Sequence, residues 1–400
     1  MGYPAMIDTR SFRYAAPLLL LLLTSPAFAT TRNIWLSAAE IKALPMTGTA
    51  WSNVRSAAYG SWGTPNLSDQ NVKHGVYVLA GALVYVRTGD ATLRAKVRDG
   101  ILAAKRTHDV LAEYGRTLSL GRQLGAYVIA ADLIDLQSYD AVADAEFRPW
   151  VSLMRTVTLP LSNTIWATLR MTDETTCNNW GAFAGASLIA ADLYLGDLKD
   201  VARRDSLFHA YTDRAFYPRN APGKTYFKPT SDYDATLTCS PTTWTAIDPG
   251  CIKTSHDCPA GLNLDGALVE DLAREHSIGP DCHLDPGTGV GASYSWEALQ
   301  GFFVQAELLY RAGHANAYAY GNNGLERALQ FMERNGGLSS LRQKVMEYVP
   351  WIANHRYGTN FSTITPFPVG RIMGWTDWTH AAVASTVKTL PGAATNPGGR

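Results

Sequence analysis

The sequence predicts an all-α protein in which consecutive helical hairpins form two layers. Apolar residues recur at helical spacing from about residue 70 to 212 and again from 294 to 349. Strongly apolar segments such as Val72–Val86 alternate with charged, amphipathic ones such as Ala91–Leu111, which is typical of an inner and an outer helix layer. Segments with the alternating pattern of strands are few.

Turn residues bound the predicted helices. Thr88-Gly89-Asp90 ends the first helix, and Gly196-Asp197 ends an Ala-rich one. Short turns of this kind join antiparallel helices. The predicted helices are Val72–Val86, Ala91–Leu111, Leu118–Leu136, Asp144–Thr156, Trp180–Leu195, Leu198–Tyr211, Tyr294–Ala312, Gly324–Asn335 and Ser339–Val349, with another near Gly266–His276.

Helical hairpins in two layers form either an open solenoid or a closed (α/α) toroid. The chain has no strict sequence repeat of the kind that solenoids show. We therefore expect an incomplete (α/α) toroid, forming one domain over residues 30–390, with a flexible tail at 391–400. Within this domain, Trp351–Arg371 is expected to be ordered coil.

The N-terminus has the three-part pattern of a secretory signal. Arg10 and Arg13 precede an apolar segment that includes six consecutive leucines, Leu18–Leu23. Ala27-Phe28-Ala29 then forms a small-x-small cleavage motif. We expect residues 1–29 to be removed and the mature chain to be periplasmic or secreted. No other segment has the length and apolarity of a membrane span.

The charge balance limits the class of partner. The 400 residues include 35 basic and 35 acidic side chains, whereas surfaces for nucleic acids or anionic membranes carry a basic excess. We therefore expect neither a nucleic acid nor a membrane as the partner of the chain. We also expect a monomer.

Residues 217–292 interrupt the helical pattern with a long segment rich in Pro, Gly, Thr, Asp and Cys. A loop of this length is usually functional. Four of the five cysteines lie in it, and an exported chain permits two disulfides, with three pairings open. Histidines there could bind zinc, but paired C-x2-C spacing is absent, so we expect no metal and no cofactor. These residues are Cys239, Cys251, Cys258, Cys282, His256, His276 and His283; Cys177 lies outside the loop.

The segment Asn178-Asn179-Trp180-Gly181 directly precedes an Ala-rich helix. One Asn is a favoured N-cap. A second amide beside it could hold an anion together with the free N–H groups of the helix. The sequence therefore predicts an anion site at this helix start.

Two further segments carry groups suited to proton transfer. Asp265–His276 holds several acids together with Arg274 and His276, and Ala292–Gly301 places Tyr294 at the start of a long helix after a Gly-rich turn. Together with the Asn pair they suit β-elimination on a uronic-acid polymer. That reaction removes the C5 proton next to the carboxylate and expels the 4-O-glycosidic oxygen, so it needs charge stabilisation, a base and an acid.

The order of these segments resembles the alginate lyase-like polysaccharide lyases, which have an (α/α) toroid fold. The similarity spans most of residues 70–380. It also includes Arg122-Gln123-Leu124, Ala130-Ala131-Asp132-Leu133, Pro350–Gly358 and Gly374–Trp378.

The resemblance implies roles for particular residues. Asn179, with Asn178 beside it, would neutralise the substrate carboxylate; Tyr294 would be the acid, and Arg274 would steady both Tyr294 and the substrate. Where the well-known alginate lyases have a His base, this chain has Trp180. We expect His276 to be the base instead. The alternatives are His74, His256, His283, His355, or Tyr294 acting as both base and acid.

The expected partner is an anionic polysaccharide such as alginate, polymannuronate or glucuronan. Loop aromatics suit a sugar cleft, because aromatic faces stack on pyranose rings. The residues expected to contact the substrate are Asn178, Trp180, Arg122, Gln123, Trp296, Arg356 and Tyr357.

Two other functions fit the same pattern. A glycoside hydrolase on the same toroid would use two carboxylates, Asp265 with Glu270 or Asp271. A non-catalytic periplasmic polysaccharide-binding protein would use the cleft without turnover.

Overall fold

The computed structural model of the chain describes residues 33–108, 115–160, 166–176, 178–212, 265–268, 271–272, 293–334, 348–363 and 370–381. These residues are mostly helical, which confirms the all-α class. The described strands are two short antiparallel segments, β1 (Leu159–Pro160) and β2 (Trp166–Ala167). The helices are α1 (Ala38–Ala43), α2 (Gly48–Tyr59), α3 (His74–Thr88), α4 (Ala91–Lys105), α6 (Thr117–Gly121), α7 (Leu124–Leu133), α8 (Leu136–Tyr139), α9 (Ala141–Met154), α10 (Leu169–Thr175), α11 (Asn179–Leu195), α12 (Leu198–Thr212), α14 (Ser293–Arg311), α15 (Tyr320–Arg334), α17 (Val349–Tyr357) and α18 (Thr376–Thr379).

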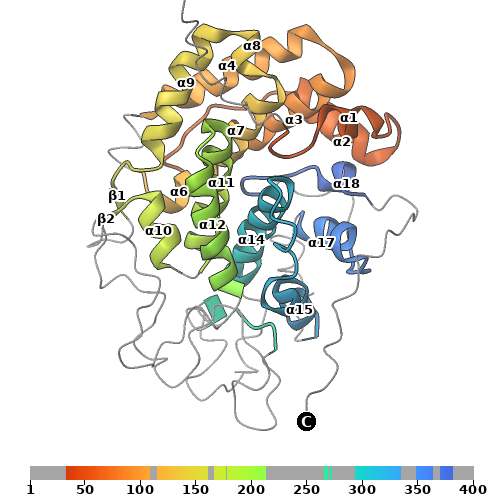
Figure 1. Ribbon diagram of the computed structural model, residues 1–400. Coiled ribbons are helices and arrows are strands. Elements are labelled where there is room, and N and C mark those ends of the chain that lie inside the picture. The colour runs from red at the N-terminus through yellow and green to blue at the C-terminus, as the bar shows by residue number, and fades with distance from the viewer. Residues whose placement is uncertain are drawn as a thin grey trace, which may run out of the picture.

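The helix α11 lies near the middle of the molecule, with α14 beside it (Figure 1). Nearly all of its residues are buried, which fits a sequence of Ala and Gly with apolar side chains on every face. It contacts α7 on one side and α14 on the other. Small residues allow these close approaches: a Cβ on Gly301 of α14 would lie 2.4 Å from the carbonyl carbon of Ala182.

The three helices α7, α11 and α14 run parallel. Gly121, at the end of α6, lies against the backbone of Phe183 and Ala184 in α11, and Gly125 near the start of α7 donates its N–H to Ser187 Oγ at 2.9 Å. Along α14 the contact moves from Glu297 with Asn179 to Gln305, whose Nε2 donates to Ala182 O at 2.8 Å. The helices α11 and α14 therefore begin at the same end of the molecule, whereas α7 begins beside the middle of α11.

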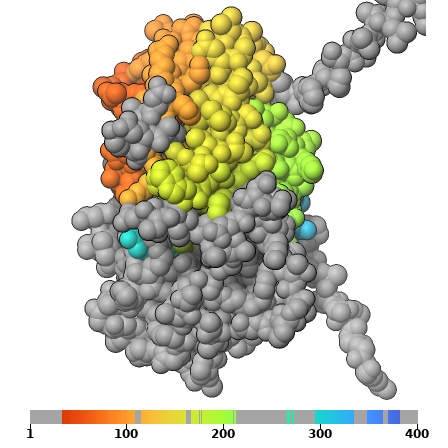
Figure 2. Space-filling model, turned by 90° about the vertical axis from the view of Figure 1, so that its left-hand side faces the viewer, coloured from red at the N-terminus to blue at the C-terminus, as the bar shows by residue number. Residues whose placement is uncertain are grey.

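Further helices pack on the outside of this series. The helix α4 contacts both α3 and α7, α9 contacts α4 and α11, and α12 contacts α11 and α14. Figure 2 shows the orange and yellow atoms of the N-terminal half packed side by side, with green atoms along their edge. This arrangement agrees with the predicted alternation of apolar and amphipathic helices.

The helix contacts continue from α14 back to the N-terminal helices. The helix α14 contacts α17, α17 contacts α18, α18 contacts α2, and α2 contacts α3, which contacts α7. Trp378 joins α18 to the N-terminal helices, since its Nε1 donates to Pro45 O at 2.8 Å and its ring lies 5.3 Å from that of Trp51 in α2.

We call residues 370–375 the C-terminal segment. It crosses from α14 and α17 to the starts of α7 and α3, and most of its residues are buried. Its hydrogen bonds join Arg371 N to Gln300 Oε1 (3.0 Å), Ile372 N to Arg122 O (2.8 Å) and Trp375 Nε1 to Val76 O (3.1 Å).

Some predicted boundaries are wrong. The predicted helix Leu118–Leu136 is divided into α6, α7 and the start of α8 by breaks at residues 122–123 and 134–135. The predicted coil after Trp351 begins only at Gly358, because α17 runs to Tyr357 and ends at Gly358 in the left-handed conformation. Helices α1 and α2 precede the first predicted helix; a Ser37–Glu40 capping box starts α1.

Several predictions fall outside the described residues. These include the signal at 1–29, most of the loop 217–292 with its four cysteines, the tail 391–400, and helix residues 339–347. Within the described part of the chain, no helix combines the length and apolarity needed to cross a membrane.

Candidate functional site

The candidate site lies where α11 and α14 begin, and Arg122 reaches it from the break between α6 and α7. Parallel helices place their N-terminal ends together, and these ends carry unsatisfied N–H groups and a partial positive charge. Gln123 precedes α7, Asn178 precedes α11, and Tyr294 is the second residue of α14. The structure thus brings together three segments that the sequence singled out separately.

Asn178 is the N-cap of α11. Its backbone is extended, and its Oδ1 accepts the N–H of Trp180 at 2.9 Å. Asn178 is 8% exposed, so its amide caps the helix and does not face solvent. Trp180 is half-buried and packs against the core. Gly181 follows where a Cβ would lie 1.8 Å from Thr176 O, which explains the glycine in this motif.

Asn179 lies between two carboxylates. Its backbone N–H donates to Asp271 Oδ1 at 3.2 Å, and its side-chain Nδ2 donates to Glu297 Oε2 at 2.8 Å. Asn179 and Asp271 are each 1% exposed. The second amide, which capping alone leaves unexplained, therefore holds an anion that belongs to the protein itself.

Arg122 contacts the same oxygen of Glu297. Its Nη2 pairs with Glu297 Oε2, and its guanidinium lies 5.4 Å from the ring of Phe183 in α11. The side chains of Arg122 and Glu297 are 5% and 12% exposed, so the pair is largely shielded from water. Such charge-assisted contacts are stronger than neutral hydrogen bonds.

Tyr294 and Glu297 share one face of α14, because residues three apart on a helix are neighbours. Tyr294 is half-buried. A phenol, a carboxylate, a primary amide and a guanidinium therefore lie at one end of the inner helices. This set can bind an anion and can exchange protons with it.

Gln123 has a different environment from the one expected of a substrate contact. Its Nε2 donates to the backbone oxygens of Asn66 (3.1 Å), Asp69 (2.9 Å) and Ser119 (3.3 Å), and the residue is 2% exposed. It therefore fixes the turn before α3 against α6.

The remaining predicted substrate contacts lie away from this cluster or inside the core. Trp296 is 1% exposed, so its ring offers no accessible face. Arg356 Nε donates to the buried Glu307 at 2.7 Å, and its guanidinium lies 4.3 Å from the Tyr310 ring. Tyr357 donates its hydroxyl to Tyr318 O at 2.8 Å.

The predicted general base His276 and the predicted Arg274 lie outside the described residues, as do the alternatives His256 and His283. His74 begins α3, and its Nδ1 lies 2.9 Å from the hydroxyl of Tyr127. Burial lowers the pKa of His74 to about 4. Burial, and then the nearby charge of His380, lower the pKa of His355 to about 4. The His355 ring lies 5.4 Å from that of His380, whose Nε2 is 3.6 Å from Glu307 Oε1.

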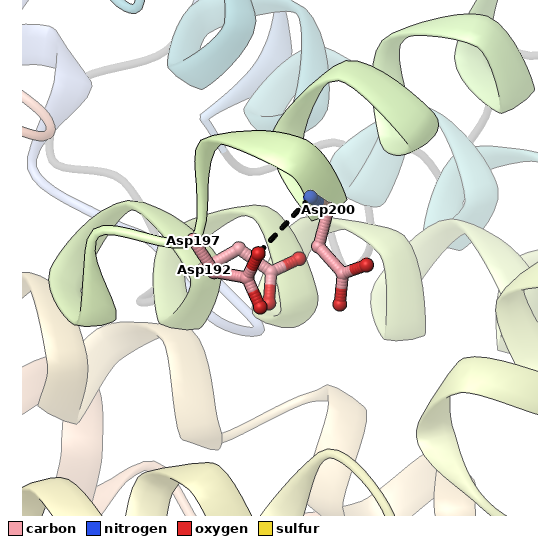
Figure 3. Close-up of side chains that lie close together, drawn as sticks. All are labelled: Asp192, Asp197 and Asp200. Atoms are coloured by element: carbon pink, nitrogen blue, oxygen red, sulfur yellow. Dashed lines mark hydrogen bonds between the residues drawn. The ribbon is translucent and has the colours of Figure 1, made fainter.

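A group of three aspartates has the spacing of metal ligands among the described residues. Figure 3 shows Asp192, Asp197 and Asp200 facing one another at the other end of α11. Arg155 Nη1 already lies 2.7, 2.9 and 3.5 Å from one oxygen of each. Arg170 pairs with Asp200 as well. The guanidinium of Arg155 thus supplies the positive charge that a cation would bring.

The cluster includes a functional candidate that sequence reasoning did not assign. Glu297 belongs to the segment Ala292–Gly301, but a Glu in the first turns of a helix usually faces solvent. Its spacing of three from Tyr294 is the one local signal that could have found it.

Comparison of the chain with protein-family models, with curated proteins and with solved structures finds no match.

Proposed function

We propose that the chain is a polysaccharide lyase that cleaves a uronic-acid polymer by β-elimination. The observation that carries this proposal is the contact of Asn179 and Arg122 with one carboxylate oxygen, one helical turn from Tyr294. Two donors that already hold a carboxylate have the chemistry to hold the carboxylate of a uronate unit.

In this reaction the proposed roles follow from the groups present. Asn179 and Arg122 stabilise the negative charge that grows on the substrate carboxylate as the C5 proton leaves. Tyr294 donates a proton to the leaving 4-O oxygen. The resemblance to alginate lyase-like enzymes implies that Arg274 steadies Tyr294 and the substrate.

We also propose that the fold is an incomplete (α/α) toroid acting as a monomer. The support is the series of contacts that leads from α3 through α7, α11, α14, α17 and α18 to α2 and returns to α3, with α4, α9 and α12 packed outside. The common end of the inner helices would then form the floor of the substrate cleft.

The test is a screen of the mature protein on alginate, polymannuronate, glucuronan and hyaluronan. Formation of an unsaturated uronate product is followed by its absorbance near the ultraviolet end. Because both groups act in the transition state, Asn179→Ala should lower kcat/KM by about 10²–10³ and Tyr294→Phe by about 10²–10⁴. Tyr59→Phe, at an exposed Tyr bonded to Asp90, is the matched control and should leave activity unchanged.

Two outcomes would reject the lyase. Reducing ends without a new double bond would mark a hydrolase. Binding without any turnover, unaffected by Asn179→Ala and Tyr294→Phe, would mark a non-catalytic binding protein.

The hydrolase remains a second candidate because of one specific observation. Asp271 and Glu297 both accept hydrogen bonds from Asn179, so two carboxylates flank one amide. A pair of carboxylates is the usual equipment of glycoside hydrolases.

A further inference from the structure

We infer that Glu297 is the general base of the proposed lyase, so this inference rests on the proposed function. The residue that follows the Asn pair is Trp180, whose indole cannot accept a proton. The reaction still needs a group that accepts the C5 proton. Glu297 is a carboxylate at the site, and it lies three residues after Tyr294 on the same helix face.

The two oxygens of Glu297 have different surroundings. Oε2 accepts from both Asn179 Nδ2, at 2.8 Å, and Arg122 Nη2. Among the residues that the structure describes, Oε1 makes no hydrogen bond, and the side chain keeps 12% exposure. One oxygen therefore fixes the carboxylate in place, while the other stays available to a proton.

The fixed position matters for catalysis. A general base must lie within hydrogen-bond reach of the proton that it removes, and a side chain with one preset orientation loses little entropy on reaching it. The rigid start of α14 supplies this orientation, because Gly301 in the same helix packs directly on Ala182 of α11.

The step balances without any further reactant. The C5–H bond breaks, and its proton passes to Glu297 Oε1. The electron pair of that bond forms the C4=C5 double bond, and the C4–O4 bond breaks. The leaving O4 takes the proton of the Tyr294 hydroxyl. Proton return from Glu297 to Tyr294, directly or through water, restores both groups for the next turnover.

This arrangement places acid and base on one helix face, so both act from the same side of the sugar ring. Elimination from one side of the ring restricts the substrate. It favours units whose C5 proton and 4-O bond lie on the same side, as in β-mannuronate and β-glucuronate, over units of the opposite C5 configuration.

The experiment compares Glu297→Gln and Glu297→Ala with the wild type on the polymer that gives the most unsaturated product. Glu297→Gln keeps the shape and an acceptor for Arg122 but removes the base, so kcat should fall by about 10²–10⁴ with KM changed less. In Glu297→Ala, added formate should restore part of the activity, because a small carboxylate can enter the space that the side chain leaves. Glu146→Gln, at a surface pair with Lys105, is the control and should leave kcat unchanged.

The outcomes separate the two proposals. A wild type that gives no unsaturated product on any polymer would overturn the proposed function itself. An active wild type whose Glu297→Gln variant keeps its kcat, or exceeds it, would overturn the inference alone; a gain would mean that Glu297 competes with the substrate for Asn179 and Arg122. Unaltered circular dichroism and formate rescue of Glu297→Ala distinguish loss of the base from loss of the fold.

Discussion

At the scale of single residues, the partners of a buried polar side chain decide whether it belongs to the site. Asn179 is buried, yet its amide reaches Glu297, which keeps partial exposure. His74 is buried with its ring nitrogen on the Tyr127 hydroxyl and against the edge of Trp62. The first residue belongs to a site, whereas the second belongs to the packing between α3 and α7.

Burial of His74 predicts a specific pH dependence of stability. An unfolded His takes up a proton below about pH 6.5, whereas burial lowers the folded pKa of His74 to about 4. Between these values the unfolded state binds more protons, so the wild type loses stability as the pH falls. His74→Gln cannot titrate at this position. The difference in free energy of unfolding between the wild type and this variant should therefore shrink by at most about 3 kcal/mol between pH 7.5 and 4.

Urea unfolding of both proteins at pH 7.5, 5 and 4 measures this difference. A deficit that stays constant over that range would show that His74 does not carry the titration. The comparison is needed because other buried groups also make the free energy of unfolding depend on pH in both proteins. One is Asp377, whose pKa burial raises to about 6.

At the scale of elements, close helix packing positions the site. The helix α11 has small residues where it meets α6 and α14, and Gly121 of α6 and Gly301 of α14 approach its backbone directly. Glu297 and Gly301 lie on one face of α14, so the spacing of the two helices also sets the contact between Glu297 and Asn179.

Gly301→Ala should therefore damage both stability and activity. The added methyl would lie 2.4 Å from a backbone carbon of Ala182, and backbone cannot move aside as a side-chain end can. Overpacking of this kind costs about 1–3 kcal/mol, and the displaced α14 should weaken the Asn179–Glu297 bond. Denaturant unfolding and product formation test the two effects.

Gly75→Ala is the matched comparison. Its methyl would meet Tyr127 and Ala126 side-chain atoms at 3.1–3.3 Å, which can yield by a few tenths of an ångström. We expect a smaller loss of stability and no change at the site. Equal effects of the two substitutions would contradict the role given to the α11–α14 spacing.

At the scale of the whole molecule, the C-terminal segment and α18 tie the last described residues to the first helices. Trp378 is 1% exposed and bonds to Pro45 O, and Trp375 bonds to Val76 O. We therefore expect residues from both ends of the chain to unfold together.

Trp378→Ala should lower the free energy of unfolding by about 3–5 kcal/mol, as for other buried large-to-small changes. Trp166→Ala, at a Trp that is 57% exposed, should change it by about 0.5 kcal/mol or less. Urea unfolding followed by fluorescence and by circular dichroism should give coincident transitions in the wild type. Separate transitions would show that the two ends unfold independently.

The sequence predicts the helices well and the site only in part. Apolar periodicity identifies α3, α4, α11, α12 and α14 because each has a long, strongly patterned segment. The break at residues 122–123 has no Pro or Gly within it. These two residues therefore did not indicate that the helix ends there or that Arg122 pairs with Glu297.

The pairing of Arg122 with Glu297 joins residues 175 positions apart. Such contacts depend on which helices become neighbours, and hydrophobic pattern alone does not specify this. The prediction that one of the two asparagines caps a helix needed only local chemistry, and Asn178 confirms it. Trp296, predicted to meet a ligand, is 1% exposed, and Glu297 was missed, because the way α14 packs against its neighbours decides which of its side chains are buried.

The bond between Trp378 and Pro45 spans 333 positions and has a consequence for biosynthesis. A chain grows from its N-terminus, so the partners of Trp378 on the early helices must wait until residue 378 has been made. Until then, the apolar surface around Trp51 is open to other chains. A holding factor that covers this surface until then would raise the yield of native protein.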